Sequence, residues 1–145
     1  IPNSVMRQIQ EIARSKNLKI VSFGESLRGA DTKLEFDPFL FVSYYSKANY
    51  VITNTFHGTI FSVIFHKQFG TFCRSKSNTG STNQEKLLDL LHRLQLENQL
   101  IKDVRNLETS LTSEIDYESV DLIREQEKAK SINYLRANIS IPKER

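Results

Sequence analysis

The chain has 145 residues, of which 39% are hydrophobic and 26% are charged, and its formal net charge is +3. This length and composition indicate one folded domain and exclude a disordered chain, and no apolar run reaches the roughly 18–20 residues of a transmembrane segment. Lysines and arginines are scattered among almost as many acids and form no basic stripe, so no nucleic-acid partner is expected.

The N-terminal part of the chain predicts a helix, a strand and a loop. Asn3 is a suitable cap for a helix whose apolar residues recur at helical spacing, and Asn17 is a suitable stop. Residues 18–23 are rich in β-branched and aromatic side chains and predict a short strand. Residues 24–36 contain two glycines and mixed charges, which predict a loop.

The middle of the chain predicts a βαβ unit preceded by a helix. Asp37 stands before Pro38, which predicts a helix from Pro38 to about Ser46. Residues 50–53 and 69–73 predict strands, and residues 59–66 are so apolar on nearly every side that they predict a buried helix. A strand, a tight turn, a helix and a second strand form a right-handed crossover with parallel strands.

The C-terminal part predicts two helices around an irregular segment. The capping box at residues 82–85 opens a helix with a broad leucine face, formed by Leu87, Leu88, Leu90, Leu91 and Leu94. Residues 97–115 predict irregular structure with one weak strand. Asp116 caps a last helix that extends to Asn138, with Val120, Ile123, Ala129, Ile132 and Leu135 among its apolar positions. The elements together predict an α/β fold with a parallel sheet and helices on both faces.

A polar stretch at residues 53–59 interrupts the most hydrophobic part of the chain. It follows a predicted strand and opens a predicted helix, which is where parallel sheets bind ligands and where helix N–H groups hold anions. Its candidate binding residues are Thr53, Asn54, Thr55, Phe56, Gly58 and Thr59. His57 is the candidate catalytic residue because imidazole exchanges protons near neutral pH, and Gly58 is expected to let a ligand approach the backbone. A helix cap with His57 bonded to a neighbouring loop explains the same residues equally well.

Residues 37–69 resemble the central signature of the polysaccharide pyruvyl transferase family. The matching positions are Ala48, Tyr50, Val51, Thr53, Asn54, Phe56, His57, Gly58, Phe61, Ser62 and Phe69. The resemblance continues more weakly through residues 86–100 and 115–135. The sequence departs from the family pattern at three positions: Thr55 replaces the usual Ser, Lys86 an Arg and Gln95 a Gly.

The resemblance implies a Rossmann-like, three-layer domain that is the C-terminal half of a two-domain enzyme. Residues 1–145 would form this single domain, and a second domain before Ile1 would be its partner. The implied reaction moves pyruvate from phosphoenolpyruvate to two hydroxyls of a polysaccharide sugar, forming a ketal, with no cofactor or metal. His57 would contact phosphate and donate a proton. Arg28, Arg74, Lys76 and Lys86 are candidates for neutralising further charge, although each is more often a surface residue.

Two other functions fit parts of the sequence. A glycosyltransferase domain would bind a nucleotide diphosphate-sugar at the same helix terminus, but no carboxylate for a ribose follows the last predicted strand of the βαβ unit before Glu85. A non-catalytic interaction module would use the last helix and would not need His57. The single cysteine, Cys73, cannot form an internal disulfide, which fits the cytoplasm. A lipid-linked acceptor would bring the protein to the inner face of the membrane.

Overall fold

The computed structural model describes residues 3–24, 27–72 and 82–139 and confirms the predicted α/β class. Helices alternate with five short strands, and all strand pairs are parallel. The strands form two sheets, one with the order β1-β2 and one with the order β3-β4-β5.

The N-terminal part contains α1 (Asn3–Ser15), β1 (Val21–Phe23) and β2 (Thr32–Leu34). The helix and the first strand confirm the sequence prediction, although the strand is shorter than residues 18–23. The prediction of a loop throughout residues 24–36 is wrong, because β2 lies within it and pairs with β1.

A short connection allows β2 to return beside β1. Gly24 and Gly29 have φ angles of 76° and 98°, a region that side chains disfavour, so these glycines make the tight path possible. The Asp31 carboxylate then accepts a hydrogen bond from the Ile20 N–H at 2.7 Å, and the Asp31 N–H donates to the Ile20 carbonyl at 2.9 Å. These bonds fix the register of β1 and β2. They do not depend on the alternating hydrophobic pattern from which a strand is normally predicted.

The central βαβ unit is built as predicted. It consists of β3 (Tyr50–Thr53), α3 (Phe56–Ile64) and β4 (Gln68–Phe72), and α2 (Pro38–Lys47) precedes it. The Asp37 carboxylate caps α2 by accepting from the Leu40 N–H at 2.7 Å. The strands β3 and β4 pair in parallel along their whole overlap, from Tyr50 beside Gln68 to Thr53 beside Thr71.

The helix α3 differs from its prediction in its start and in its burial. It begins at Phe56 instead of residue 59, so much of the polar stretch is its first turn. Thr59 and Ser62 are fully buried, whereas Ile64 is 47% exposed. The expectation of a helix buried through apolar residues on nearly every side is therefore wrong. Small polar side chains let α3 pack closely on the sheet, and Ile64 faces solvent.

The C-terminal part contains two main helices and several short elements. They are α4 (Thr82–Arg93), η1 (Glu97–Gln99), β5 (Leu100–Ile101), η2 (Val104–Asn106), α5 (Leu107–Thr112) and α6 (Tyr117–Asn138). The weak strand predicted in residues 97–115 is β5, but the helix α5 was not predicted. The leucine face of α4 is confirmed for Leu87, Leu91 and Leu94, which are buried, whereas Leu88 is 39% exposed. The side chain of Thr82, the predicted N-cap of α4, lies outside what the structure describes.

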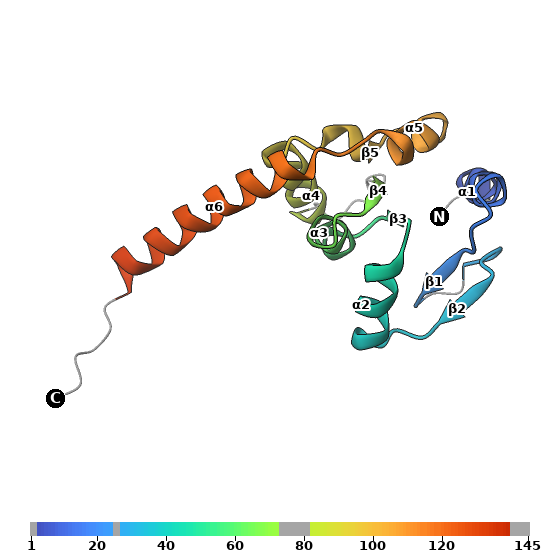
Figure 1. Cartoon of the computed structure of the whole chain (residues 1–145), viewed down its shortest axis with the longest axis horizontal. Helices are drawn as coiled ribbons and strands as arrows, with labels where there is room; N and C mark the ends of the chain where they lie inside the picture. Colours follow the sequence, from blue (N-terminus) through green and yellow to red (C-terminus); the bar gives the residue numbers. More distant parts are fainter. Residues whose placement is uncertain (1–2, 25–26, 73–81, 140–145) are drawn as a thin grey trace.

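The predicted three layers are present around β3-β4-β5. On one face, Val51 and Phe69 pack in a cluster with side chains of α2, α3, α4 and α6. On the other face, Tyr50, Ile52 and Phe72 pack with a cluster of side chains from α1, η2 and α5. Figure 1 shows α3 and α4 on one side of β4 and α1 and α5 on the other. Alternate residues of each strand thus serve two separate cores, as the pleat requires.

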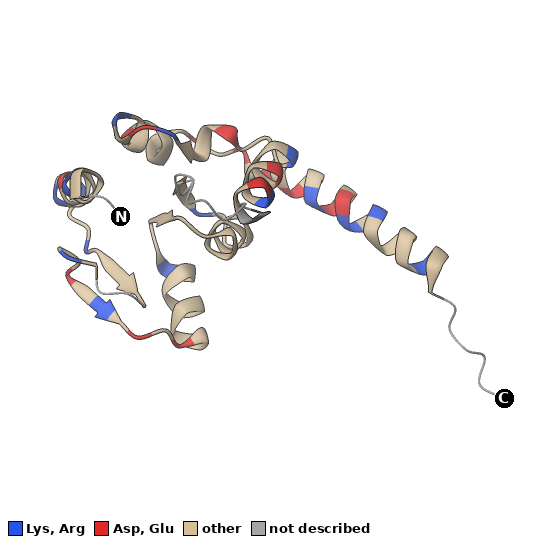
Figure 2. Cartoon of the chain, turned by 180° about the vertical axis from the view of Figure 1, so that it is seen from behind, with Lys and Arg blue, Asp and Glu red and all other residues tan. Residues whose placement is uncertain are grey.

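The last helix confirms its predicted ends, and most of its apolar positions are exposed. The Asp116 carboxylate accepts from the Ser119 N–H at 3.1 Å and caps α6. Val120 is buried, but every residue from 128 to 138 is exposed, including the predicted apolar positions Ala129, Ile132 and Leu135. Figure 1 shows this end of α6 extending away from the rest of the chain. Figure 2 shows acids and bases interspersed along the earlier part of α6 and only Lys and Arg toward its end.

Candidate functional site

The polar stretch joins the carboxyl end of β3 to the first turn of α3. Thr53 ends the strand, Thr55 is the N-cap, and Phe56 and His57 occupy the first helical positions. A central strand of the sheet, β4, runs parallel beside β3. The stretch therefore lies at the edge of the sheet where the sequence pattern placed a ligand site.

Two threonine hydroxyls hold the turn. The Thr55 hydroxyl accepts from the Gly58 N–H at 3.0 Å, which is the capping bond of α3. The Thr53 hydroxyl accepts from the Thr55 N–H at 3.2 Å and lies 3.1 Å from the Thr55 hydroxyl. The helix-cap interpretation is thus correct for Thr55. A cap satisfies only some of the free N–H groups of a first turn, so it does not exclude a ligand.

A second set of hydroxyls lies beneath the turn. The Thr59 hydroxyl lies 3.1 Å from both the Thr55 carbonyl and the Thr71 hydroxyl of β4. The Ser62 hydroxyl donates to the Gly58 carbonyl at 2.8 Å, and Tyr45 of α2 donates to the same carbonyl at 3.3 Å. These buried bonds attach the first turn of α3 to β4 and α2. The sequence analysis did not single out Thr71 or Tyr45.

Gly58 is required by packing inside the protein. A Cβ atom at this position would lie 2.2 Å from the Thr53 hydroxyl oxygen and 2.9 Å from the Thr53 Cβ. Gly58 is also buried beneath the turn. The structure thus gives this glycine a role different from the close ligand approach expected from the sequence: it lets α3 start directly against β3.

His57 and the first two N–H groups of α3 are the candidate ligand-binding groups of the turn. His57 is exposed, and its ring meets Phe56 edge-on at 5.9 Å between centroids. The N–H groups of Phe56 and His57 stand at helical positions that have no acceptor inside the helix. Asn54, just before the cap, is half-buried. An imidazole, an amide and two N–H groups at the positive end of a helix form a suitable surface for an anion.

The other predicted cations do not converge on this turn in the described part of the chain. Arg28 lies in the β1–β2 connection and Lys86 on α4; both are exposed, and neither makes a recorded polar contact with the turn. Arg74 and Lys76 lie outside the described residues, as does Cys73. The contacts therefore join residues 53–59 into one candidate site. A role for the other cations in ligand binding stays a prediction.

Comparison with protein families identifies the part of the chain that carries the turn. Residues 6–72 match the family model of polysaccharide pyruvyl transferase. The matched segment, which is less than half of the chain, is similar to this family. It runs from α1 through β4 and contains the whole turn, and it confirms the resemblance based on residues 37–69. Comparisons with curated proteins and with solved structures found no match.

The matched family is one of polysaccharide pyruvyl transferases. The match covers residues 6–72, less than half of the chain, so it indicates a general relation of this segment to that chemistry. The helices α4 to α6 lie beyond the matched residues, so the weaker resemblance of residues 86–100 and 115–135 stays a prediction. Among the described residues, no group of three or more His, Cys, Asp or Glu side chains is arranged to hold a metal ion, and no helix is both long and apolar enough to cross a membrane.

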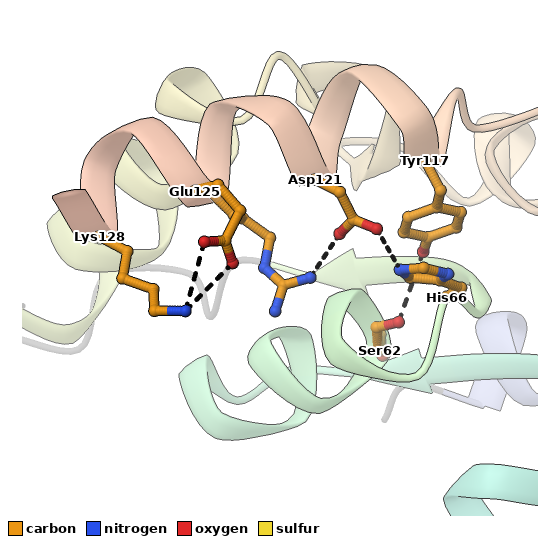
Figure 3. Close-up of polar contacts among 7 residues, drawn as sticks. Ser62, His66, Tyr117, Asp121, Glu125 and Lys128 are labelled. Atoms are coloured by element: carbon orange, nitrogen blue, oxygen red, sulfur yellow. Dashed lines mark hydrogen bonds and ion pairs between the residues drawn. The ribbon is translucent and has the colours of Figure 1, made fainter.

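The two remaining histidines of the chain make other contacts. His66 follows α3 and has a φ of 50°. Its Nε2 lies 2.9 Å from the Asp121 carboxylate of α6, and its ring stacks on Tyr117 (Figure 3). The sequence analysis did not predict this pairing with α6. His92 is exposed and pairs with Glu97 at 2.8 Å, and Asp89 pairs with Arg93.

A hollow of about 260 Å³ lies between the end of α4, η1 and the start of α6, with Gln95, Asn98 and Ser119 in its wall. No residue of the candidate turn lines it.

Proposed function

We propose that the first turn of α3 binds phosphoenolpyruvate in a pyruvyl transferase that forms a cyclic ketal on a sugar. The observation that supports the proposal is the exposed His57 side chain beside the first two N–H groups of α3, within the family-matched segment. Phosphoenolpyruvate carries a phosphate and a carboxylate, both of which such a helix terminus favours.

The proposed reaction has two stages. One sugar hydroxyl adds to the carbon of the enol that bears the phosphate, while the neighbouring methylene receives a proton and becomes a methyl group. A second sugar hydroxyl then attacks the same carbon, loses its proton, and displaces phosphate to close the ketal. The enzyme must therefore supply a proton donor, stabilise a multiply charged phosphate and hold a carboxylate.

The residues of the turn divide into two groups in this proposal. His57 contacts the phosphate and donates the proton, and Asn54 with the N–H groups of Phe56 and His57 holds one anionic end of the donor. Thr53, Thr55 and Thr59 use their hydroxyls inside the turn, so they contribute by fixing the N–H groups. Gly58 allows the turn to lie against β3. Arg28, Arg74 and Lys86 remain the proposed sources of further positive charge.

The proposal also assigns an acceptor and a location. The acceptor is a sugar of a cell-surface polysaccharide or of its lipid-linked precursor. The reaction would take place in the cytoplasm, at the inner face of the membrane when the acceptor carries a lipid.

The test is calorimetric titration of the natural full-length protein with phosphoenolpyruvate and, separately, with a nucleotide diphosphate-sugar. We expect phosphoenolpyruvate to bind, and His57→Ala to weaken binding about 10-fold or more, because a hydrogen bond to a charged group contributes about 1.5–3 kcal/mol. His92→Ala is the matched control, since His92 is exposed on α4 and should leave binding unchanged.

Three results would contradict the proposal. Equal phosphoenolpyruvate affinity in wild type and His57→Ala would place the donor elsewhere. His57-dependent binding of the nucleotide sugar alone would favour glycosyl transfer. Heat from neither ligand would remove the turn as a donor site and favour an interaction module.

A further inference from the structure

A buried tyrosine hydroxyl contacts the candidate turn from below. Tyr45 of α2 is 9% exposed, and its hydroxyl donates to the carbonyl of Gly58, which stands in the first turn of α3. The ring packs against Phe41 and Phe61, with centroids 4.4 Å and 6.0 Å away. Since the aromatic contacts fix the ring, the hydroxyl has a defined position under the turn.

Burial keeps the Tyr45 hydroxyl protonated. Burial raises the pKa of Tyr45 to about 12, and hydrogen bonds with Ser62 and Thr53 oppose part of this rise. At neutral pH the hydroxyl is therefore a donor. A buried hydroxyl needs a partner, and the Gly58 carbonyl provides one.

We propose that Tyr45 is a positioning residue for the donor site. The Gly58 carbonyl accepts from Tyr45 and from Ser62, while the Gly58 N–H donates to Thr55. Both sides of this residue are thus held, and the preceding N–H groups of Phe56 and His57 keep a fixed direction toward solvent. Preorganised donors bind an anion more strongly than mobile ones, because less ordering is needed on binding. The inference rests on the function proposed above.

The opposite end of α3 offers a matched comparison. The Tyr117 hydroxyl of α6 donates to the Lys67 carbonyl at 2.5 Å. It also lies 3.4 Å from the Ser62 carbonyl (Figure 3). Burial also raises the pKa of Tyr117. Two tyrosine hydroxyls with similar chemistry thus hold α3, one beside the candidate site and one at the far end.

The experiment compares Tyr45→Phe with Tyr117→Phe in the natural full-length protein. Each substitution removes one hydroxyl without removing the ring. We expect Tyr45→Phe to raise the dissociation constant for phosphoenolpyruvate about 5-fold and to speed amide exchange of Phe56 and His57 in the ligand-free protein. Tyr117→Phe should leave both quantities within about 2-fold of wild type. Tyr44→Phe, on the same helix but 38% exposed, is the second control.

The outcomes separate this inference from the proposed function. Equal effects of Tyr45→Phe and Tyr117→Phe on binding and exchange would mean that Tyr45 contributes only to the general stability of the fold. This result would overturn the inference. Wild-type protein that does not bind phosphoenolpyruvate would overturn the proposed function, and the exchange rates alone would then decide whether Tyr45 orders the turn. If Tyr45→Phe is unstable, Ser62→Ala replaces it, because Ser62 is the other side chain that donates to Gly58.

Discussion

At the scale of the residue, Gly58 links the chemistry of the turn to its packing. Alanine usually stabilises a helix by about 1 kcal/mol relative to glycine. At this position the added Cβ would lie 2.2 Å from the Thr53 hydroxyl oxygen, which the strand holds in place. The steric conflict therefore outweighs the gain in helix propensity.

We predict that Gly58→Ala lowers the free energy of unfolding by about 3 kcal/mol, a typical upper value for overpacking. Urea unfolding measures this change. The control is Gly24→Ala, where nothing lies within 4 Å of the added Cβ but φ is 76°, so the cost should be about 1 kcal/mol. A Gly58→Ala protein as stable as wild type would mean that the turn has room for a side chain.

Gln95 is a second residue whose backbone conformation favours glycine. It follows α4 with a φ of 57°, and the next N–H, of Leu96, donates to the Leu91 carbonyl at 2.8 Å. This pattern is a helix C-terminus in which glycine is preferred. The family resemblance also places glycine here.

We predict that Gln95→Gly raises the free energy of unfolding by about 0.5–1 kcal/mol, because the left-handed conformation costs a side chain more than glycine. Thermal and urea unfolding both measure it. Asn17, with a φ of 53° after α1, is the matched position, and Asn17→Gly should gain less because asparagine tolerates this conformation. A destabilised Gln95→Gly protein would contradict this account of the α4 end.

At the scale of the element, α6 is anchored at its start and exposed at its end. The Asp116 cap, the Tyr117 hydroxyl and the His66–Asp121 pair all lie in its first two turns. Hydrogen bonds from the Ser119 side chain and N–H lower the pKa of Asp116 below its usual value. A carboxylate with a lowered pKa in the folded state stabilises the fold above its unfolded pKa and loses this effect as the pH falls through its folded pKa.

We predict that wild-type protein loses more stability than Asp116→Asn as the pH falls from 6 to below the folded pKa of Asp116, since asparagine caps the helix without titrating. Urea unfolding at several pH values measures the difference between the two proteins. Glu118→Gln, in the same turn, is the control for removing a negative charge near the helix start. A constant difference between wild type and Asp116→Asn across this range would show that the cap does not depend on the charge.

At the scale of the whole molecule, the elements that were predicted correctly have strong local signals in the sequence. Asp37-Pro38 and Asp116 gave correct helix starts because a cap is a short-range interaction. The parallel βαβ unit followed from the order of its elements. The strand β2 and the helix α5 were missed because long-range contacts fix them: β2 through β1 and Ile20, and α5 through Leu107 and Leu111 in the core beside α1.

The candidate site was predictable only in part for the same reason. Residues 53–59 are contiguous, so their pattern was visible in the sequence. Tyr45 and Thr71 reach the turn from separate positions along the chain, and no spacing rule connects them to it. The sequence pattern therefore identified the contiguous residues and missed the contacts that Tyr45 and Thr71 make with them.

The most direct test of the central claim is to follow the backbone amide resonances of the natural full-length protein by NMR during titration with phosphoenolpyruvate. We predict that the amides of Phe56 and His57 shift in proportion to saturation, whereas those of His66 and His92 do not. Shifts confined to other parts of the chain, or no shifts at saturating donor, would contradict the assignment of the α3 turn as the donor site.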